Sequence, residues 1–178
     1  MRVSVHSAED GTFDQFWDKF VSRYVKEVKK VTKILDVAKS QSVWSLYYKF
    51  PPPVSPRLFT ELQTFYYVNE SPRTGQYSFE PNAQQSRLTH TGPSIIVSLP
   101  VDLSGPEQKH LADLEEQGDV KGRYVSVERI LEMDDGKVEW RMATASTPGG
   151  SIPKFLTEHS MPKSVAADVP QFLEYLQK

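Results

Sequence analysis

The strongest local signal in the sequence is a predicted β-hairpin in the second half of the chain. Two runs rich in β-branched and aromatic residues, 122–133 and 137–146, flank the turn sequence Asp134-Asp135-Gly136. An Asp-Gly pair between such runs favours a tight turn. We therefore predict two long antiparallel strands, one face of which must be buried against another part of the chain.

Shorter runs elsewhere predict further strands. They either alternate apolar with polar residues or are rich in aromatic and β-branched residues, and proline ends several of them. The predicted segments are 2–6, 43–50, 59–68 and 94–101, with at most one more short strand near 77–79. The rest of residues 69–92 is polar and predicts loops.

An amphipathic helix is predicted near the N-terminus. Thr12 and Gln15 have the spacing of a capping box, and apolar residues then recur every three or four positions from Phe13 to about Leu35. This pattern predicts one helix or two in tandem. A basic stripe on the opposite face is interpreted as a solvated face, with an anionic membrane surface as the alternative. The stripe consists of Arg23, Lys26, Lys29, Lys30 and Lys33.

A second helix is predicted from Ser151 through Leu176, with Pro162 and Pro170 expected to break or kink it. The order of elements is then strand, helix, several antiparallel strands and a long terminal helix. This order predicts an α+β fold in which helices cover one side of a curved antiparallel sheet. The length of 178 residues suits a single domain over residues 1–178.

Composition excludes several classes of function. The chain has no cysteine, which rules out thiolate nucleophiles and cysteine metal sites, and its four histidines form no local metal motif. A net charge of −2 argues against nucleic acid as a partner. Phosphate-cradling glycine loops, nucleophile elbows and dinucleotide fingerprints are also missing from the sequence. We therefore expect no metal and no other cofactor.

No stretch of the sequence suits a signal peptide or a membrane-spanning helix, which needs about 20 apolar residues. A cytoplasmic location is the simplest expectation.

The segment from Gly122 onward resembles the C-terminal part of START (steroidogenic acute regulatory protein-related lipid transfer) domains. The resemblance rests on the hairpin, on a glycine-containing turn at 147–150, on Ile152-Pro153-Lys154-Phe155 and on the helical pattern over 160–176. The whole pattern, roughly 3–176, is more similar still to a fungal START-like family of unassigned function. Many START domains carry an acidic residue and a lysine before the glycine of that turn, whereas this chain has Thr147-Pro148. The ligands of sterol- or phospholipid-binding members therefore do not carry over.

The resemblance implies a helix-grip fold, in which the curved antiparallel sheet wraps around the long C-terminal helix and leaves a hydrophobic cavity. The implied function is non-catalytic binding of a lipid or other hydrophobic small molecule and its transfer between membranes, with transient contact to a membrane surface. Two alternatives stay open. One is an enzyme on the same scaffold, similar to cyclases or hydrolases, which would use Glu128 with His159 or Tyr124. The other is a protein-interaction module that resembles chaperone-activating START-like domains.

Alternation along the hairpin predicts which side chains face the helix. The opposite set is more charged and should face water. The inward set, together with two residues of the terminal helix, gives the predicted ligand-binding residues, for which ordinary core packing is the alternative. They are Tyr124, Ser126, Glu128, Ile130, Val138, Trp140, Met142, Thr144, Phe155 and His159.

Glu128 is the sharpest single case in this set. A carboxylate that faces an apolar interior must be paired or have a raised pKa. It can form an internal structural pair, contact a ligand hydroxyl or act as a general acid. If the alternation holds, Arg129 and Arg141 lie on the opposite face and cannot be its partners.

Overall fold

The structure of the protein, a computed structural model, describes residues 1–21, 28–49, 55–68, 79–80, 94–116, 120–147, 149–150 and 166–177. The strands are β1 (Arg2–His6), β2 (Val28–Ala38), β3 (Gln41–Tyr48), β4 (Arg57–Val68), β5 (Phe79–Glu80), β6 (Ser94–Pro100), β7 (Val120–Glu132) and β8 (Val138–Thr147). The helices are α1 (Phe13–Val21), a 3-10 turn (Pro106–Gln108), α2 (Lys109–Ala112) and a C-terminal helix over 166–176.

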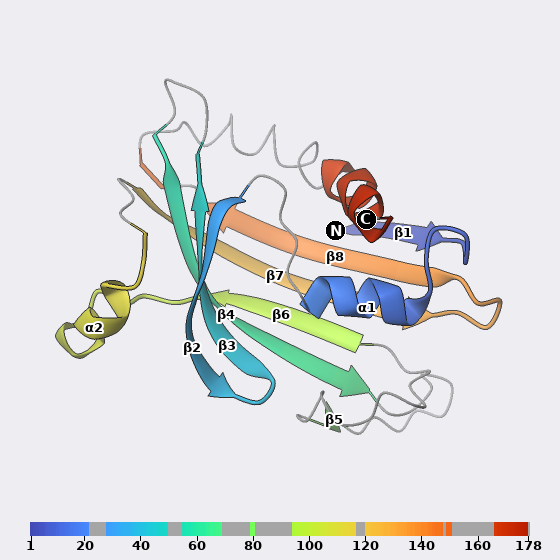
Figure 1. Ribbon diagram of the computed structural model, residues 1–178, viewed down its shortest axis with the longest axis horizontal. Coiled ribbons are helices and arrows are strands. Elements are labelled where there is room, and N and C mark those ends of the chain that lie inside the picture. Colours follow the sequence, from blue (N-terminus) through green and yellow to red (C-terminus); the bar gives the residue numbers. More distant parts are fainter. Residues whose placement is uncertain are drawn as a thin grey trace.

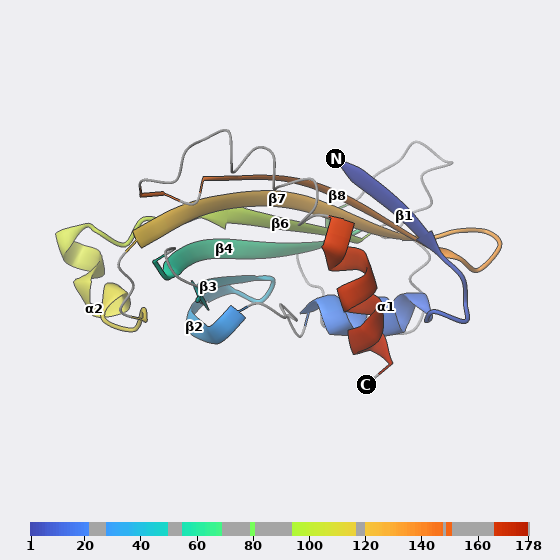
Figure 2. The ribbon, with the colours of Figure 1, turned by 90° about the horizontal axis from the view of Figure 1, so that it is seen from above.

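All these strands belong to one curved sheet (Figure 1). They follow each other in the order β1-β8-β7-β6-β4-β3-β2, and β5 pairs with β4. The neighbours along this path are antiparallel. Figure 2 shows that the strands arch over α1 and the C-terminal helix, which lie on the same, concave side of the sheet. The predicted α+β class with a curved antiparallel sheet is therefore confirmed.

Helix α1 begins where the sequence predicts, because Thr12 and Gln15 form the expected capping box. The Thr12 backbone N–H donates to Gln15 Oε1 over 2.8 Å, and the Gln15 backbone N–H donates to Thr12 Oγ1 over 3.3 Å. These two bonds satisfy backbone donors at the start of the helix. The predicted continuation of the helix to Leu35 is wrong, since residues 28–38 form strand β2.

Strand β2 shows why the spacing of its apolar residues led to a wrong prediction of helix. Its β-branched residues favour a strand, and pairing with β3 overrides the three-residue spacing that looks helical. Register shifts interrupt the ladder at three places, and only Ile34 of the eleven residues is buried. The basic residues Lys29, Lys30 and Lys33 are exposed on this edge strand, where lysine hinders pairing with another chain. Arg23 and Lys26 lie outside the described residues.

The predicted hairpin is confirmed as β7 and β8, which pair without interruption from Arg123 and Thr147 to Glu132 and Val138. The turn between them is closed by a hydrogen bond from the Gly136 N–H to the Met133 carbonyl oxygen, over 2.9 Å. Gly136 has a φ of +73°, a backbone angle that glycine takes without steric cost.

The other predicted strands are confirmed as well. The segments 2–6, 43–50, 59–68 and 94–101 correspond to β1, β3, β4 and β6, with ends that differ by one or two residues. The short strand predicted near 77–79 overlaps β5 at Phe79. Residues 69–78 and 81–93 lie outside the described part of the chain.

A helix is present over residues 166–176, where the sequence predicts the last part of the terminal helix, and it is not broken at Pro170. Its predicted start at Ser151, and Pro162, lie outside the described residues. A terminal helix long enough for the complete helix-grip fold therefore stays a prediction.

Aromatic side chains hold both helices against the sheet. The ring centroid of Phe172, in the C-terminal helix, lies 4.3 Å from that of Phe20 and 5.4 Å from that of Phe16. It also lies 5.4 Å from the ring of Trp140 on β8. Aromatic pairs of this kind contribute about 0.5–1.5 kcal/mol each beyond the burial of their area. Helices from the two ends of the chain therefore meet over one hydrophobic core on the concave face.

A smaller hydrophobic cluster lies on the other, convex side of the sheet. Its buried residues are Ile34, Val43 and Leu103. Next to it, the Thr60 hydroxyl donates to Glu115 Oε1, and Lys121 Nζ lies 2.6 Å from Glu115 Oε2. These contacts attach the segment that contains α2 to the convex face.

Strands β4 and β7 touch directly beyond the end of β6, where Phe59 pairs with Gly122 in a short parallel contact. The Phe59 ring lies so close that a Cβ added at Gly122 would stand 2.3 Å from the ring carbon Cε1. Tyr48 contacts the same ring, with centroids 5.4 Å apart. Glycine at position 122 thus makes room for an aromatic ring at one end of the concave face.

Replacement of Gly122 by alanine tests this contact. We expect Gly122→Ala to lower the free energy of unfolding by about 1–3 kcal/mol, because the ring and the backbone must move apart. Urea denaturation measures the change. Gly105→Ala is the matched control, since its added Cβ meets only the end of the flexible Gln108 side chain. Equal stability of the two variants would contradict this description of the β4–β7 contact.

His6 makes the stability dependent on pH. It is buried at the end of β1, its Nε2 lies 2.9 Å from Ser4 Oγ, and its ring centroid lies 5.2 Å from that of Phe16. Burial lowers the pKa of His6 below 6.5, although Asp10 acts in the opposite direction. The unfolded chain therefore takes up this proton more readily than the folded chain, and stability is lost as the pH falls below about 6.5.

Comparison of the natural chain with His6→Gln isolates this effect. We expect the free energy of unfolding to fall between about pH 7.5 and pH 5 in both proteins, and to fall less in the variant, which lacks the titrating imidazole. Chemical denaturation at the two pH values gives both differences. An equal or larger fall in His6→Gln would show that His6 does not cause the loss.

Candidate functional site

The concave face of the sheet carries most of the predicted site. Residues that pair directly across two strands lie on the same face of the sheet. Residues two positions apart along one strand also share a face. Ile130 and Trp140 pair with each other and belong to the core beneath the helices, so their face is the concave one. The β7 and β8 residues on this face are Tyr124, Ser126, Glu128, Ile130, Val138, Trp140, Met142 and Thr144.

Two neighbouring rows of paired residues cross four strands on the concave face. One row consists of Phe65, Ile96, Glu128 and Met142 and is apolar except for the Glu128 carboxylate. Arg2 of β1 pairs with Met142 and continues this row on the same face. The other, which we name the polar row, consists of Gln63, Ser98, Ser126 and Thr144. The two rows lie side by side because their members are two residues apart on each strand.

The polar row is largely buried, although its hydrogen bonds are incomplete. Gln63, Ser98 and Ser126 are 7%, 3% and 1% exposed. Within the described part of the chain, Gln63 Oε1 has no hydrogen-bond partner. The Ser126 hydroxyl lies beside the Tyr124 phenol, and Thr144 Oγ1 donates to the Val125 carbonyl oxygen over 3.2 Å. A buried polar group without a partner costs about 1–3 kcal/mol. The unpaired Gln63 Oε1 carries this cost.

Tyr124 lies beside the polar row on the same face. Burial raises the pKa of its phenol, and the negative charge of Glu128 adds to this, while the nearby hydroxyls of Ser126 and Thr144 act in the opposite direction. The phenol therefore stays protonated at neutral pH and can donate a hydrogen bond.

Glu128 has a hydrogen-bond partner on the neighbouring strand. Trp140 Nε1 donates to Glu128 Oε2 over 3.1 Å. This bond gives the half-buried carboxylate the structural pairing that its position requires. Contact of Glu128 with a ligand and its use as a general acid stay predictions.

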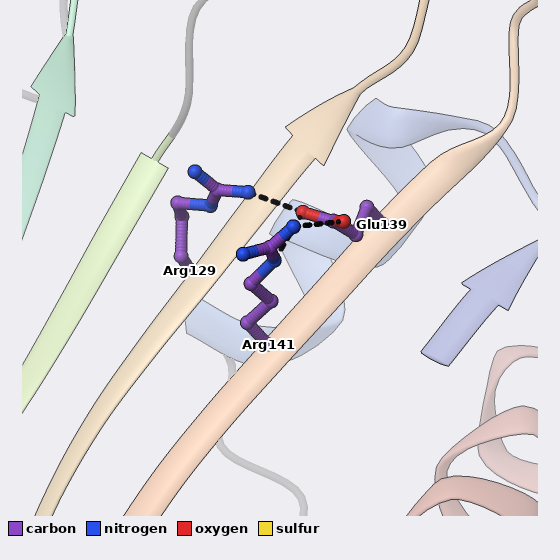
Figure 3. Close-up of polar contacts among 3 residues, drawn as sticks. All are labelled: Arg129, Glu139 and Arg141. Atoms are coloured by element: carbon purple, nitrogen blue, oxygen red, sulfur yellow. Dashed lines mark hydrogen bonds and ion pairs between the residues drawn. The ribbon is translucent and has the colours of Figure 1, made fainter. Parts of the chain in front are cut away.

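The convex face of the same hairpin carries a separate charged cluster (Figure 3). Arg141 Nε and Nη2 each lie 2.8 Å from a carboxylate oxygen of Glu139, and Arg129 also pairs with Glu139. The hydrogen bonds from Arg141, and then those from Arg129, lower the pKa of the Glu139 carboxyl. Both arginines are thus engaged on the face opposite Glu128, as the alternation predicts.

The ten predicted ligand-binding residues fall into three groups. Ile130, Val138, Trp140 and Met142 are buried in the hydrophobic core. Tyr124, Glu128 and Thr144 are half-buried on the concave face, with buried Ser126 among them. Phe155 and His159 lie outside the described residues. A role in ligand binding stays a prediction for all ten.

Two members of the polar row, Gln63 and Ser98, were missed by the sequence analysis. Gln63 lies on β4, where both faces are buried, so no contrast between an apolar and a charged face marks its direction. The signal that could have found it is the alternation Phe59, Glu61, Gln63 and Phe65, with aromatic residues at both ends of a polar pair.

In the described part of the chain, no helix is long and apolar enough to cross a membrane. Nor does any group of three or more His, Asp or Glu side chains there lie close enough together to hold a metal ion.

Three solved structures share this fold. Human STARD10 has a TM-score of 0.69 at 12% identity; the match covers 99% of this chain and 62% of that chain. Human StAR-related lipid transfer protein 5 has a TM-score of 0.65 at 13% identity, with 99% and 75% covered. The STAR-related lipid transfer protein from Xanthomonas axonopodis has a TM-score of 0.65 at 14% identity, with 99% and 84% covered. The resemblance to START domains is therefore confirmed at the level of the fold.

A comparison with curated protein sequences finds no match. The family model described as "Protein of unknown function (DUF3074)" matches residues 1–176, which is almost the whole chain. The protein therefore belongs to the DUF3074 family and has a START-like fold.

Proposed function

We propose that the protein binds a lipid or another hydrophobic small molecule against the concave face of its sheet and transfers it between membranes without converting it. One observation carries the proposal. In a fold shared with StAR-related lipid transfer proteins, the concave face places a largely apolar row beside a buried polar row in which Gln63 Oε1 has no partner. Such a surface is complementary to a molecule with an apolar body and a polar end.

Enclosure by protein is the physical requirement for such a carrier. Exposure of a lipid chain to water costs about 0.8 kcal/mol per methylene, or roughly 13 kcal/mol for a chain of sixteen carbons. A protein that shields the chain removes most of this cost and needs no reactive group. Binding alone is therefore sufficient for the proposed function.

The proposal gives the concave side chains distinct roles. Tyr124, Ser126 and Thr144 hydrogen-bond the polar end of the ligand, and Met142 beside them contacts its apolar part. Phe155 and His159 are proposed to line the same space from the terminal helix. Transient contact with a membrane surface and a cytoplasmic location complete the proposal.

A bulky side chain at Thr144 should block the ligand. Thr144 faces the concave side and is half-buried, whereas Met142 belongs to the packed core, where a larger residue would strain the fold. We expect Thr144→Phe to reduce the extraction of lipid from vesicles at least about tenfold, a loss of roughly 1.4 kcal/mol in binding. Lipid that remains with the protein after removal of the vesicles measures extraction.

Ala145→Phe is the matched control, because Ala145 is exposed on the adjacent position of the same strand and points to the convex side. It adds the same ring outside the proposed site and should leave extraction unchanged. Thermal unfolding of both variants verifies that they fold. Normal extraction by a folded Thr144→Phe protein would contradict the proposed binding face.

A further inference from the structure

Strands β2 and β3 form a strongly basic part of the protein. The sequence from 28 to 49 contains five lysines and a single acidic residue, Asp36, and therefore has a net charge of +4. The whole chain has a net charge of −2, so the remaining residues together carry −6. Strand β2 is at the edge of the sheet, and we name residues 28–49 the basic edge. Its lysines are all exposed and are Lys29, Lys30, Lys33, Lys39 and Lys49.

Ion pairs neutralise only part of this charge. Lys30 and Lys33 each pair with one acidic residue. In the described part of the chain, Lys29, Lys39 and Lys49 form no ion pair. The basic edge therefore has positive charge that can attract an external anionic surface.

Irregular pairing distributes the lysines around the edge of the sheet. A register shift between β2 and β3 makes Lys29 an extra residue, as in a β-bulge, which twists the strand. Beyond it, Lys30 pairs with Tyr47 on the convex face, whereas Lys33 pairs with Trp44 on the concave face. A flat anionic surface that meets the sheet edge-on can therefore contact lysines from both faces.

Apolar and aromatic side chains lie among these lysines. Val31 and Val37 are 38% and 53% exposed. Lys33 Nζ lies 5.4 Å from the centroid of the Trp44 ring. Lysines together with apolar and tryptophan side chains suit the boundary between lipid headgroups and acyl chains. The composition of the basic edge thus matches a lipid surface better than it matches water alone.

The basic edge is connected to the proposed binding face. Val31 pairs with Leu46, and Leu46 pairs with Phe59 of β4. Phe59 is four residues from Gln63 and so faces the same, concave side. These pairs form an apolar row from the strand that carries Gln63 to the exposed edge of the sheet. A lipid that leaves the concave face along this row reaches the basic edge.

We propose that the basic edge is the surface with which the protein docks on an anionic membrane. Its lysines contact the lipid headgroups, and Val31 and Val37 reach the boundary with the acyl chains. The row of Val31, Leu46 and Phe59 then lies between the membrane and the binding face. This inference rests on the proposed function and adds to it the part of the protein that meets the membrane and the charge of that membrane.

Vesicles without any protein component test the docking. Vesicles of phosphatidylcholine alone are compared with vesicles that also contain phosphatidylserine, and the protein that sediments with them is measured. We expect at least about tenfold stronger binding to the anionic vesicles, because each lysine near such a surface contributes about fivefold. An increase in salt from about 0.1 M to about 1 M should remove most of this preference, since the Debye length falls from about 10 Å to about 3 Å.

Reversal of single charges tests the lysines. Lys29→Glu and Lys39→Glu should each weaken binding to the anionic vesicles about tenfold or more, because each exchange removes an attractive charge and adds a repulsive one. Lys137→Glu is the matched control. Lys137 is also exposed, and it lies in the turn between β7 and β8, well away from β2 in the strand order. This control changes the net charge equally and should weaken binding about twofold at most.

Glutamate also separates membrane docking from protection of the edge strand. A charge of either sign hinders pairing of β2 with another chain, so that protection is kept in Lys29→Glu and Lys39→Glu. Thermal unfolding and size-exclusion chromatography verify that the variants fold and keep the oligomeric state of the natural chain.

The outcomes separate the inference from the proposed function. Equal binding to the two kinds of vesicle would overturn the inference, and it is the result expected if the basic edge serves an acidic protein instead. Unchanged binding by folded Lys29→Glu and Lys39→Glu proteins, or an equal loss in Lys137→Glu, would also overturn it. Lipid retained by the protein after removal of the vesicles is measured in parallel. Its presence in any of these cases leaves the proposed function intact, and its absence from the natural chain would overturn that function.

Discussion

The contact of Phe172 with Phe16, Phe20 and Trp140 is the constraint on which the rest of the structure depends. It joins a helix from each end of the chain to strand β8, so neither helix can move without opening the core. The two helices cover the part of the concave face that is lined by Ile130, Val138 and Trp140. Their position also determines where the apolar core ends and where the polar row begins.

Beyond that boundary, the concave face differs from an ordinary core. The polar row runs across four strands and is largely buried, and Gln63 Oε1 lacks a partner in the described residues. An interior that served stability alone would gain from apolar residues there, since unsatisfied buried groups cost free energy. The ion-paired cluster of Arg129, Glu139 and Arg141 lies on the opposite face of the hairpin. In the proposed function, a ligand offsets this cost.

Much of this arrangement could be predicted from the sequence, and the failures have physical causes. Alternation over 122–146 predicted both faces of β7 and β8, because one face is much more charged than the other. The same reasoning failed for β2, an irregular edge strand whose β-branched residues have helix-like spacing. It also missed Gln63, because β4 is buried on both faces and its pattern shows no preferred side. Cross-strand register, which the sequence does not encode locally, was needed to assemble the polar row.

Native mass spectrometry most directly tests the claim that the concave face holds one lipid molecule. The protein is incubated with vesicles of mixed lipids, separated from them and sprayed under non-denaturing conditions. The account predicts a chain that carries one lipid per molecule, with the adduct lost in the folded Thr144→Phe variant and kept in Ala145→Phe. A natural chain that emerges without any lipid, or a Thr144→Phe chain that keeps the adduct, would contradict it.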